Sequence, residues 1–417
     1  MDQLHRRFTV EQVKVLLHGY CQGNLARADA QELLGVGKTR FFVLLQDYRS
    51  SPTAFSIAYE RETHARISTS TERAIAIELR REQKLVEDPR LPISGYNYSA
   101  IRDRLEQKGI RVSATTITAR AKQLGCYKPH PKIKTHDREV ITTSIGELVQ
   151  HDASQHLWSP FATEKWSLIT SLDDFSRKLL FADFFLHETT WAHLQAAQIL
   201  MQTYGLPVRY YVDNLRVFRF VQYRDSVHRT QDWQTDDADP RWRQVLRGLG
   251  VDVTYALSPQ AKGKVERPYR WLQDRIVRTC ALEHITTLEE ARSVLHDELA
   301  RYNQHQVHST TRQIPDVRFA EAQASGHSLF RPFVLPKPYQ SPQDVFCLQT
   351  TRVVNSFRRI SLFGQDIVVP NVPPRVEIEI HLVPDLPKQL IEARMWWSGK
   401  RVHSVSIPMA IAKGVHF

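Results

Sequence analysis

The sequence predicts a multidomain protein with an all-α N-terminal region, a central α/β core built on a mixed sheet, and a small C-terminal β-barrel. Apolar residues recur at helical spacing through the first 126 residues. Short apolar runs then alternate with helical patterns between residues 141 and 325, and short β-type runs follow at regular spacing. A chain of 417 residues is also too long for one ordinary hydrophobic core.

Composition narrows the class of protein. The chain is 42% hydrophobic and 24% charged, which is typical of globular proteins. No apolar stretch is long enough to span a bilayer, and the first seven residues lack the apolar segment of a secretory signal. The four cysteines lie far apart and fit neither a zinc site nor a disulfide scaffold. We therefore expect a cytoplasmic protein and exclude the secreted and membrane classes.

The net charge of +11 is unevenly distributed. Residues 1–150 contain 24 Lys and Arg against 17 Asp and Glu, residues 151–320 contain 21 of each, and residues 321–417 contain 11 against 7. Most of the N-terminal excess lies in residues 98–135, where nine basic residues accompany two acidic ones. A basic segment beside a neutral block indicates a region that binds a polyanion, although a solvated surface is the alternative.

Residues 1–50 predict a first helix-turn-helix domain. Three short helices are expected, with a turn at Gly35–Gly37 before the third. The third helix is expected to bury Phe41, Phe42, Leu44 and Leu45. Its first turn carries the candidate DNA-contacting residues Lys38 and Arg40.

Residues 68–126 predict a second helix-turn-helix domain. Helices are expected at 73–87, at 98–108 and, after Ser113 as N-cap, at 114–124. The last of these presents short polar and cationic side chains that can reach bases and phosphates: Thr115, Thr118, Arg120 and Lys122. Residues 127–140 contain two prolines and no apolar periodicity, so we expect a basic linker.

The central region predicts five strands and several helices. The strands are expected at 147–152, 166–172, 179–186, 208–213 and 251–256, and helices at 191–204 and 241–249. Ser258-Pro259 is expected to begin a long helix. Hairpin-linked strands followed by alternating strands and helices predict a mixed sheet flanked by helices, over residues 141–325. Six later β-type runs, between residues 352 and 406, predict the barrel at 340–410.

Three acids stand out by position. Asp152 and Asp213 are expected to end the first and fourth strands, and Glu266 lies in the long helix. If those strands are neighbours, both aspartates emerge at the same edge of the sheet. Burying unpaired carboxylates together is costly, and a pair of Mg²⁺ ions removes that cost. Two metals roughly 3.5–4 Å apart could hold both the attacking and the leaving oxygen of a phosphoryl displacement.

For each of these three acids, the alternative to metal binding is an ordinary structural function as a turn or helix-capping residue. We assign that ordinary function to Asp173, Asp174 and Asp225. Lys262, Glu266 and Arg270 are four residues apart and share one helix face. This spacing fits a metal ligand beside a phosphate track, and it equally fits a surface ladder of ion pairs.

Together these acids resemble the acidic triad of the DDE transposase and retroviral integrase superfamily. The sequence Lys-Gly-Lys-Val-Glu-Arg around Glu266 resembles the glutamate motif of that family. The flanking elements resemble the tail motif of bacterial insertion-sequence transposases: Tyr302-Asn303, His308-Ser309 and Pro315. Tandem helix-turn-helix domains and a C-terminal barrel are similar to Mu-like transposases. The resemblance covers nearly the whole chain and implies an RNase H-like catalytic core.

Three features depart from the family pattern. Leu215 follows Asp213-Asn214 where the family often has glycine. Fifty-three positions separate Asp213 from Glu266, more than in retroviral integrases, and residues 220–240 are expected to form a surface insertion. The zinc-binding N-terminal domain of retroviral integrases is not expected, because no paired cysteines support it.

The resemblance implies a metal-dependent strand transferase without a covalent intermediate. Water attacks the phosphodiester at the element end, and the freed 3′-hydroxyl then attacks target DNA. Asp152 and Asp213 would ligate the first of two Mg²⁺ ions, with Asp152 bridging and Glu266 completing the second; Mn²⁺ is expected to substitute. Candidate phosphate contacts are Lys262, Lys264, Arg267 and Arg270. Trp158 and His151 lie near the first acid, and core packing explains them equally well.

The expected partners are double-stranded DNA, as terminal inverted repeats and target, and further copies of the chain in a dimer or tetramer on DNA. A partner ATPase is left open, and the expected location is the bacterial nucleoid. Two other functions are considered. One is a catalytically silent DNA-binding regulator with the transposase fold, and the other is a structure-selective nuclease with an RNase H-like core.

Overall fold

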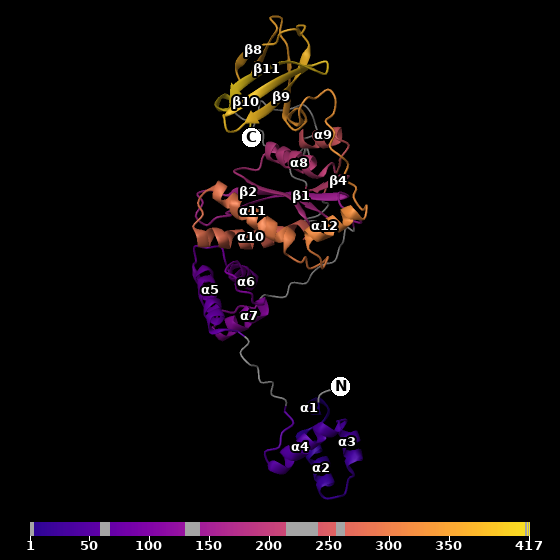
Figure 1. Ribbon diagram of the computed structural model, residues 1–417. Coiled ribbons are helices and arrows are strands. Elements are labelled where there is room, and N and C mark those ends of the chain that lie inside the picture. The colour runs from indigo at the N-terminus through magenta and orange to yellow at the C-terminus, as the bar shows by residue number, and fades with distance from the viewer. Residues whose placement is uncertain are drawn as a thin grey trace, which may run out of the picture. The chain divides into compact units, whose positions relative to one another are not determined.

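The computed structural model describes residues 4–58, 67–129, 142–213, 241–255 and 263–412, together with Val415 and Phe417; within 263–267 it describes the backbone only. The chain divides into two compact units, Met1–Ala74 and Ile75–Phe417. Figure 1 labels the elements of both units. This division is coarser than the five predicted segments, whose boundaries stay a prediction. No helix in the described ranges is both long enough and apolar enough to cross a membrane.

The first unit contains the three expected helices and one short additional helix. These are α1 (Leu4–Arg7), α2 (Val10–Cys21), α3 (Arg27–Leu34) and α4 (Lys38–Ser50). A capping box begins α2, because the Thr9 hydroxyl accepts from the Gln12 N–H while Gln12 Oε1 accepts from the Thr9 N–H. The prediction that Phe42 is buried was wrong. Phe41 fills the core, and the next residue on a helix points about 100° away, so Phe42 is 41% exposed.

The second unit begins with three helices that match the sequence prediction closely. They are α5 (Thr69–Glu87), α6 (Tyr98–Gln107) and α7 (Ala114–Gln123). Asn97 caps α6 by accepting from the Ala100 N–H at 2.9 Å. Ser113 caps α7 by accepting from the Thr116 N–H at 3.1 Å, which confirms the predicted N-cap. Their function as DNA-binding helix-turn-helix domains stays a prediction.

A mixed five-stranded sheet forms the core of this unit, as predicted. Its strands are β1 (Leu148–His156), β2 (Trp166–Asp173), β3 (Leu179–Phe185), β4 (Arg209–Val212) and β5 (Asp252–Tyr255). Their order is β3-β2-β1-β4-β5. The first three strands pair antiparallel, whereas β4 pairs parallel with both β1 and β5. The strand with the first candidate acid therefore lies beside the strand that precedes the second.

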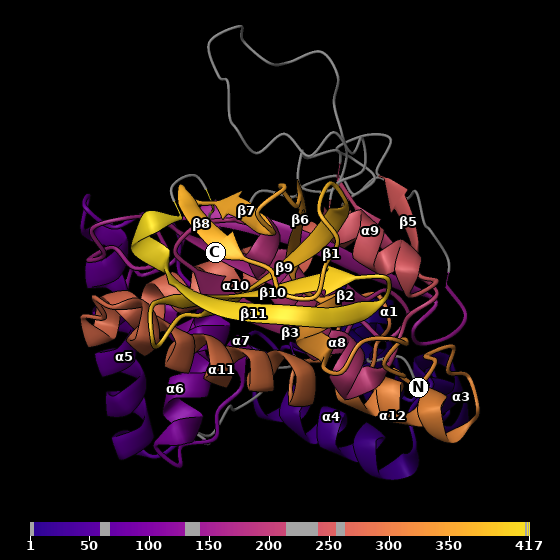
Figure 2. The same cartoon turned by 90° about the horizontal axis from the view of Figure 1, so that it is seen from above.

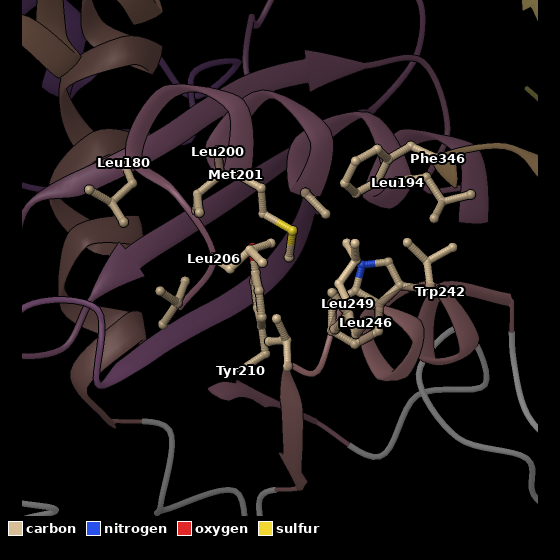
Figure 3. Close-up of a cluster of buried hydrophobic side chains, with 14 of the residues drawn as sticks. Leu180, Leu194, Leu200, Met201, Leu206, Tyr210, Trp242, Leu246, Leu249 and Phe346 are labelled. Atoms are coloured by element: carbon tan, nitrogen blue, oxygen red, sulfur yellow. The ribbon is translucent and has the colours of Figure 1, made fainter. Parts of the chain in front are cut away.

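Helices cover both faces of the sheet (Figure 1). On one face, α8 (Thr190–Tyr204) and α9 (Arg241–Gly248) share a core that includes Tyr210 and Trp242 (Figure 3). On the other, α10 (Gly263–Glu283) and α11 (Leu288–Gln304) pack against Leu168 and Leu172 of β2. Each fully buried large apolar side chain contributes about 1.5–3 kcal/mol to the stability of these layers. Helix α12 (Pro315–Ala324) follows.

The six expected C-terminal strands are present, but they do not close into one hydrogen-bonded barrel among the described residues. They are β6 (Leu348–Val353), β7 (Arg359–Leu362), β8 (Gln365–Val368), β9 (Glu377–Asp385), β10 (Leu390–Trp397) and β11 (Lys400–Pro408). Four form a sheet in the order β11-β10-β9-β6, and β7 and β8 form a separate hairpin (Figure 2). The two parts share one apolar core.

A buried ion pair anchors this sheet to the short helix α13 (Pro342–Val345). Arg394 Nη1 on β10 donates to Asp344 Oδ1 at 2.7 Å, and the amides of Ser341 and Gln340 donate to Asp344 Oδ2 at 2.8 and 3.0 Å. Burial alone raises the pKa of the Asp344 carboxyl, but these donors outweigh it, so the pKa lies below its ordinary value.

Replacing Asp344 with Asn is expected to lower the free energy of unfolding by about 3 kcal/mol at pH 7, because it breaks a buried pair. A carboxyl whose folded pKa is lowered stabilises the fold above its unfolded pKa of 3.8 and loses that contribution as pH falls through the folded value. Urea unfolding of wild type and Asp344→Asn between pH 7 and pH 2.5 checks this. A stability difference that stays constant over that range contradicts it.

Candidate active site

The structure places Asp152 in the middle of a strand, which corrects the prediction that it ends one. β1 continues to His156, where it pairs with Trp166 of β2. The parallel pairing with β4 stops earlier, at Gln150 opposite Tyr211. Asp152 therefore lies just beyond the point where β1 loses its parallel neighbour, and its side chain is half-buried.

Asp213 follows the last residue of β4 directly, so the predicted strand end is confirmed. The parallel register pairs Leu148 with Arg209 and Gln150 with Tyr211. Asp152 and Asp213 each lie two residues beyond the last paired residues, Gln150 and Tyr211, on strands that are about 4.8 Å apart where they pair. Residues at the same level of neighbouring strands share a face of the sheet. Strand pairing thus brings the strand that carries Asp152 beside the strand that ends just before Asp213.

The hydroxyl of Tyr269 ties α10 to the sheet at the level of Asp152. It donates to the Asp152 carbonyl oxygen at 2.6 Å and accepts from Thr170 Oγ1 at 2.8 Å, and Thr170 is the residue paired with Asp152. Burial, with a smaller contribution from the Asp152 charge, raises the pKa of Tyr269 well above its ordinary value. The hydroxyl therefore remains protonated and can donate throughout the neutral range. Sequence reasoning missed this residue.

Glu266 lies in the first turn of α10, three residues before Tyr269. Residues three apart are neighbours on one helix face, so the turn that carries Glu266 adjoins the strand that carries Asp152. The side chains of Glu266, Lys264 and Arg267 lie outside the described part of the chain. Lys262 and the predicted helix start at Ser258-Pro259 also lie outside it. Arg270 is exposed.

Among the side chains that the structure describes, no group of three or more His, Cys, Asp and Glu could hold a metal ion. The side chain of Glu266 is not among those described. The donor set fits a hard divalent cation, since carboxylate oxygens are the ligands that Mg²⁺ prefers.

Asp173 and Asp174 have the structural function expected of turn residues. Asp173 accepts from the Gly146 and Ser176 amides, both at 2.8 Å, and from Ser176 Oγ at 2.6 Å, while burial raises the pKa of its carboxyl. Asp174 accepts from Arg177 Nη1 at 2.9 Å. Both acids hold the β2–β3 turn, and Asp225 lies outside the described residues.

The other residues near the first acid pack into the core. His151 Nε2 lies 2.9 Å from His193 Nδ1 of α8, so this side chain is on the sheet face opposite α10. Trp158 is fully buried and donates to the Trp166 carbonyl at 3.0 Å. Core packing therefore accounts for both.

The tail motif connects α11 to the sheet. Asn303 Oδ1 accepts from the Leu179 N–H and Asn303 Nδ2 donates to the Leu179 carbonyl, each at 3.0 Å. Tyr302 is buried, and burial raises the pKa of its hydroxyl. His308 Nδ1 accepts from the Thr310 N–H at 3.3 Å, and Pro315 begins α12. These contacts give the motif a structural function that its spacing did not predict.

The candidate DNA contacts lie in both units. Lys38 and Arg40 are exposed in the first turn of α4. On α7, Thr115 and Lys122 are exposed, and Lys122 Nζ lies 4.9 Å from the ring centre of Tyr127. Thr118 Oγ1 instead donates to the Ala114 carbonyl at 2.8 Å, and Arg120 is half-buried. DNA contact by these residues stays a prediction.

The chain has relatives among transposases. It is similar to a putative transposase, y4bF, of Sinorhizobium fredii, with 28% identity over 265 residues that cover 63% of this chain and 53% of that protein. It is also similar to the transposase for insertion sequence IS1202 of Streptococcus pneumoniae, with 31% identity over 171 residues, 41% of this chain and 35% of that one. The matched region thus spans about half or less of these relatives. They confirm the resemblance to insertion-sequence transposases.

No protein-family model matches the chain. Among solved structures it is similar to the HTLV-2 integrase catalytic core domain in complex with magnesium, with 15% identity and a TM-score of 0.31 over 42% of this chain and 96% of that one. It is also similar to a chain of the simian T-cell lymphotropic virus intasome in complex with a PP2A regulatory subunit, with 13% identity and a TM-score of 0.33 over 74% of this chain and 92% of that one.

Proposed function

We propose that this chain is a DDE-type transposase that binds the ends of a mobile element, hydrolyses the phosphodiester there and joins the freed 3′-hydroxyl to target DNA. One observation supports the proposal: β1 pairs in parallel with β4 up to two residues before Asp152 and Asp213, and the Tyr269 hydroxyl of α10 donates to the Asp152 carbonyl oxygen. This arrangement supports the convergence of three acids from distant parts of the sequence. The similarity to transposases over 63% of the chain supports the same function.

Asp152, Asp213 and Glu266 are the residues that would hold two Mg²⁺ ions. When bound, such ions polarise the phosphodiester and generate the attacking nucleophile at neutral pH. The protein contributes the fixed positions of these carboxylates and the Tyr269 hydrogen bond that keeps α10 against the sheet. The basic residues proposed to contact the phosphates of the DNA backbone are Lys262, Lys264, Arg267 and Arg270. Each step is an in-line displacement without a covalent protein intermediate.

The proposal assigns a function to each segment. Residues 1–50 and 68–126 would be helix-turn-helix domains that bind the terminal inverted repeats, residues 127–140 a linker, and residues 141–325 an RNase H-like core. Residues 340–410 would be a separate C-terminal β-domain. Because two element ends must be joined together, a dimer or tetramer on duplex DNA is the expected active form.

Joining of a pre-cut oligonucleotide to a plasmid in the presence of Mg²⁺ tests this function. The oligonucleotide carries the inverted repeat found in DNA that flanks the gene. A transposase yields joined products that require the divalent cation. Cuts without joined products would identify a structure-selective nuclease, and binding without either product would identify a silent regulator.

Lys122→Ala is expected to weaken duplex binding at all sequences alike, because it removes a cation from the exposed surface of α7. The slope of log affinity against log salt concentration should become shallower by about 0.9, the value for one phosphate contact. Fluorescence anisotropy across a salt series measures this slope. Lys84→Ala is the matched control, an exposed lysine on α5, and should leave the slope unchanged. Equal slopes for both variants contradict a DNA-contacting α7.

A further inference from the structure

The N-terminal helices of the second unit pack directly against α10. Leu85 of α5 and Ile93, which follows that helix, form a buried apolar cluster with Val277 and Ala281 of α10. The helical segment 67–129 is therefore docked on the core through the helix that carries Glu266. The predicted linker is not the sole connection between them.

A buried network of ion pairs surrounds this apolar contact. Arg278 of α10 is only 3% exposed, and its guanidinium donates to Glu82 of α5, to the Gly95 carbonyl at 2.5 Å and to Asp274 at 2.8 Å. Glu82 is fully buried and also accepts from Arg104 of α6 at 2.8 Å. One guanidinium thus links α10 to α5 and to the loop before α6.

A second arginine of α10 links it to α6 and α11. Arg275 is 3% exposed and donates to Asp103 of α6 at 2.6 Å and to Glu298 of α11 at 3.5 Å. Arg301 of α11 lies 3.7 Å from the same Asp103 carboxylate. The two buried arginines of α10 therefore form ion pairs with carboxylates on α5, α6 and α11.

Such a network sets the position and orientation of α10 as well as holding the neighbouring helices together. Burying ions is costly, and the cost is offset only when the partners are well placed. The planar guanidinium bonds carboxylates in a fixed fork, so it restricts the rotation and the translation of the helix that bears it. Alternative positions of α10 would break the Arg278–Glu82 and Arg275–Asp103 pairs.

These contacts lie on the same helix as Glu266. Arg275 and Arg278 follow Glu266 by nine and twelve residues, which is about 14 and 18 Å along the helix axis. Tyr269, which lies between Glu266 and Arg275 on α10, donates its hydroxyl to the Asp152 carbonyl oxygen at 2.6 Å. α10 is thus held on one side by the sheet and on another by the helical segment.

We propose that Arg275 and Arg278 are positioning residues for the metal site, because they fix α10 against α5 and α6 and so set the position of the helix that carries Glu266. This rests on the proposed function. It makes the packing of α5 and α6 on α10 part of what orders the site. Loosening the network weakens metal binding even where the fold survives.

Binding of Mn²⁺ to the full chain without DNA, followed by the electron paramagnetic resonance signal of the free ion, tests this inference. The variant is Arg275→Lys/Arg278→Lys, which keeps both charges and loses the fork geometry. We expect it to fold, by circular dichroism, and to bind Mn²⁺ about tenfold more weakly, the usual effect of losing a group that orients metal ligands. Arg278→Lys alone is expected to show a smaller loss and serves if the double variant does not fold.

Arg292→Lys is the matched control. Arg292 of α11 also forms a half-buried pair, at 2.9 Å to Asp183, but it does not lie on α10, so Mn²⁺ affinity should be unchanged. Glu266→Gln establishes that the titration reports the triad. The positioning function is overturned if Glu266→Gln weakens Mn²⁺ binding but the Arg275 and Arg278 variants do not. It is also overturned if those variants weaken Mn²⁺ binding no more than Arg292→Lys does. If Glu266→Gln has no effect, the metal site of the proposed function falls with it.

Discussion

Replacing Asp213 with Asn is expected to abolish Mg²⁺-dependent cleavage and joining while duplex binding is retained. Asn has nearly the shape of Asp but lacks the negative charge that a hard divalent cation requires. Losing about 4 kcal/mol of metal-derived stabilisation of the transition state corresponds to a loss of roughly a thousandfold in rate. The measurement is the rate of joining of a pre-cut end, with affinity for the same duplex measured in parallel.

Asp252→Asn is the matched control for this prediction. Asp252 is exposed at the start of β5, in the same sheet, and should be replaceable without loss of activity. If Asp213→Asn retains a tenth or more of the wild-type rate, Asp213 is not a metal ligand. If both variants lose DNA binding, their effect is on the fold.

Replacing Tyr269 with Phe is the second change with a large expected effect. It removes a hydroxyl that donates to the Asp152 carbonyl at 2.6 Å and accepts from Thr170 at 2.8 Å. Because two hydrogen bonds of a buried hydroxyl are lost, the free energy of unfolding should fall by about 1–3 kcal/mol. The contact that holds α10 at Asp152 is also lost, so the Mg²⁺ concentration needed for half-maximal rate should rise about tenfold. Urea unfolding and a Mg²⁺ titration of the joining rate measure the two effects.

Tyr302→Phe is the control for this substitution. Tyr302 is buried in the same apolar cluster, yet its hydroxyl has no hydrogen-bond partner within the described residues. Its replacement by Phe should leave stability and the Mg²⁺ requirement close to wild type. If the two variants behave alike, the hydrogen bond to Asp152 does not position α10.

Local signals predicted the elements of this fold well. Ser113 caps α7 because a hydroxyl before a helix can accept from the free amides of the first turn, and this preference is visible in sequence. The end of β4 at Asp213 was likewise visible as an apolar run stopped by an acid. Such signals depend on neighbours in the chain, so they need no knowledge of long-range pairing.

What the sequence did not predict depends on long-range pairing. β1 extends past Asp152 because its polar residues Ser154 and Gln155 pair with β2, and polar residues give little signal for a strand. Barrel closure failed as a prediction for the same reason, since the sequence shows strands but not which of them pair. The parallel pairing of β1 with β4, which brings the strand of Asp152 beside the strand that precedes Asp213, joins segments about sixty residues apart.

The docking of the helical segment was also invisible in the sequence. Glu78 and Glu82 lie in a highly charged helix, and such charges are usually solvated, yet both are fully buried against arginines. Their partners lie on α6 and α10, so that no local pattern reveals them. Tyr269 was missed for the same reason, because an apolar position on a helix gives no sign of a hydrogen bond to a distant strand.

Convergence of the three acids on shared cations can be measured directly by metal-directed backbone cleavage. Fe²⁺ replaces Mg²⁺ in the full chain, ascorbate and peroxide generate hydroxyl radicals at the bound ion, and mass spectrometry maps the cut positions. The account predicts cuts near Asp152, Asp213 and Glu266 together, suppressed by excess Mg²⁺ and lost in Asp213→Asn. Cuts near one of these acids alone, or at positions away from all three, would contradict it.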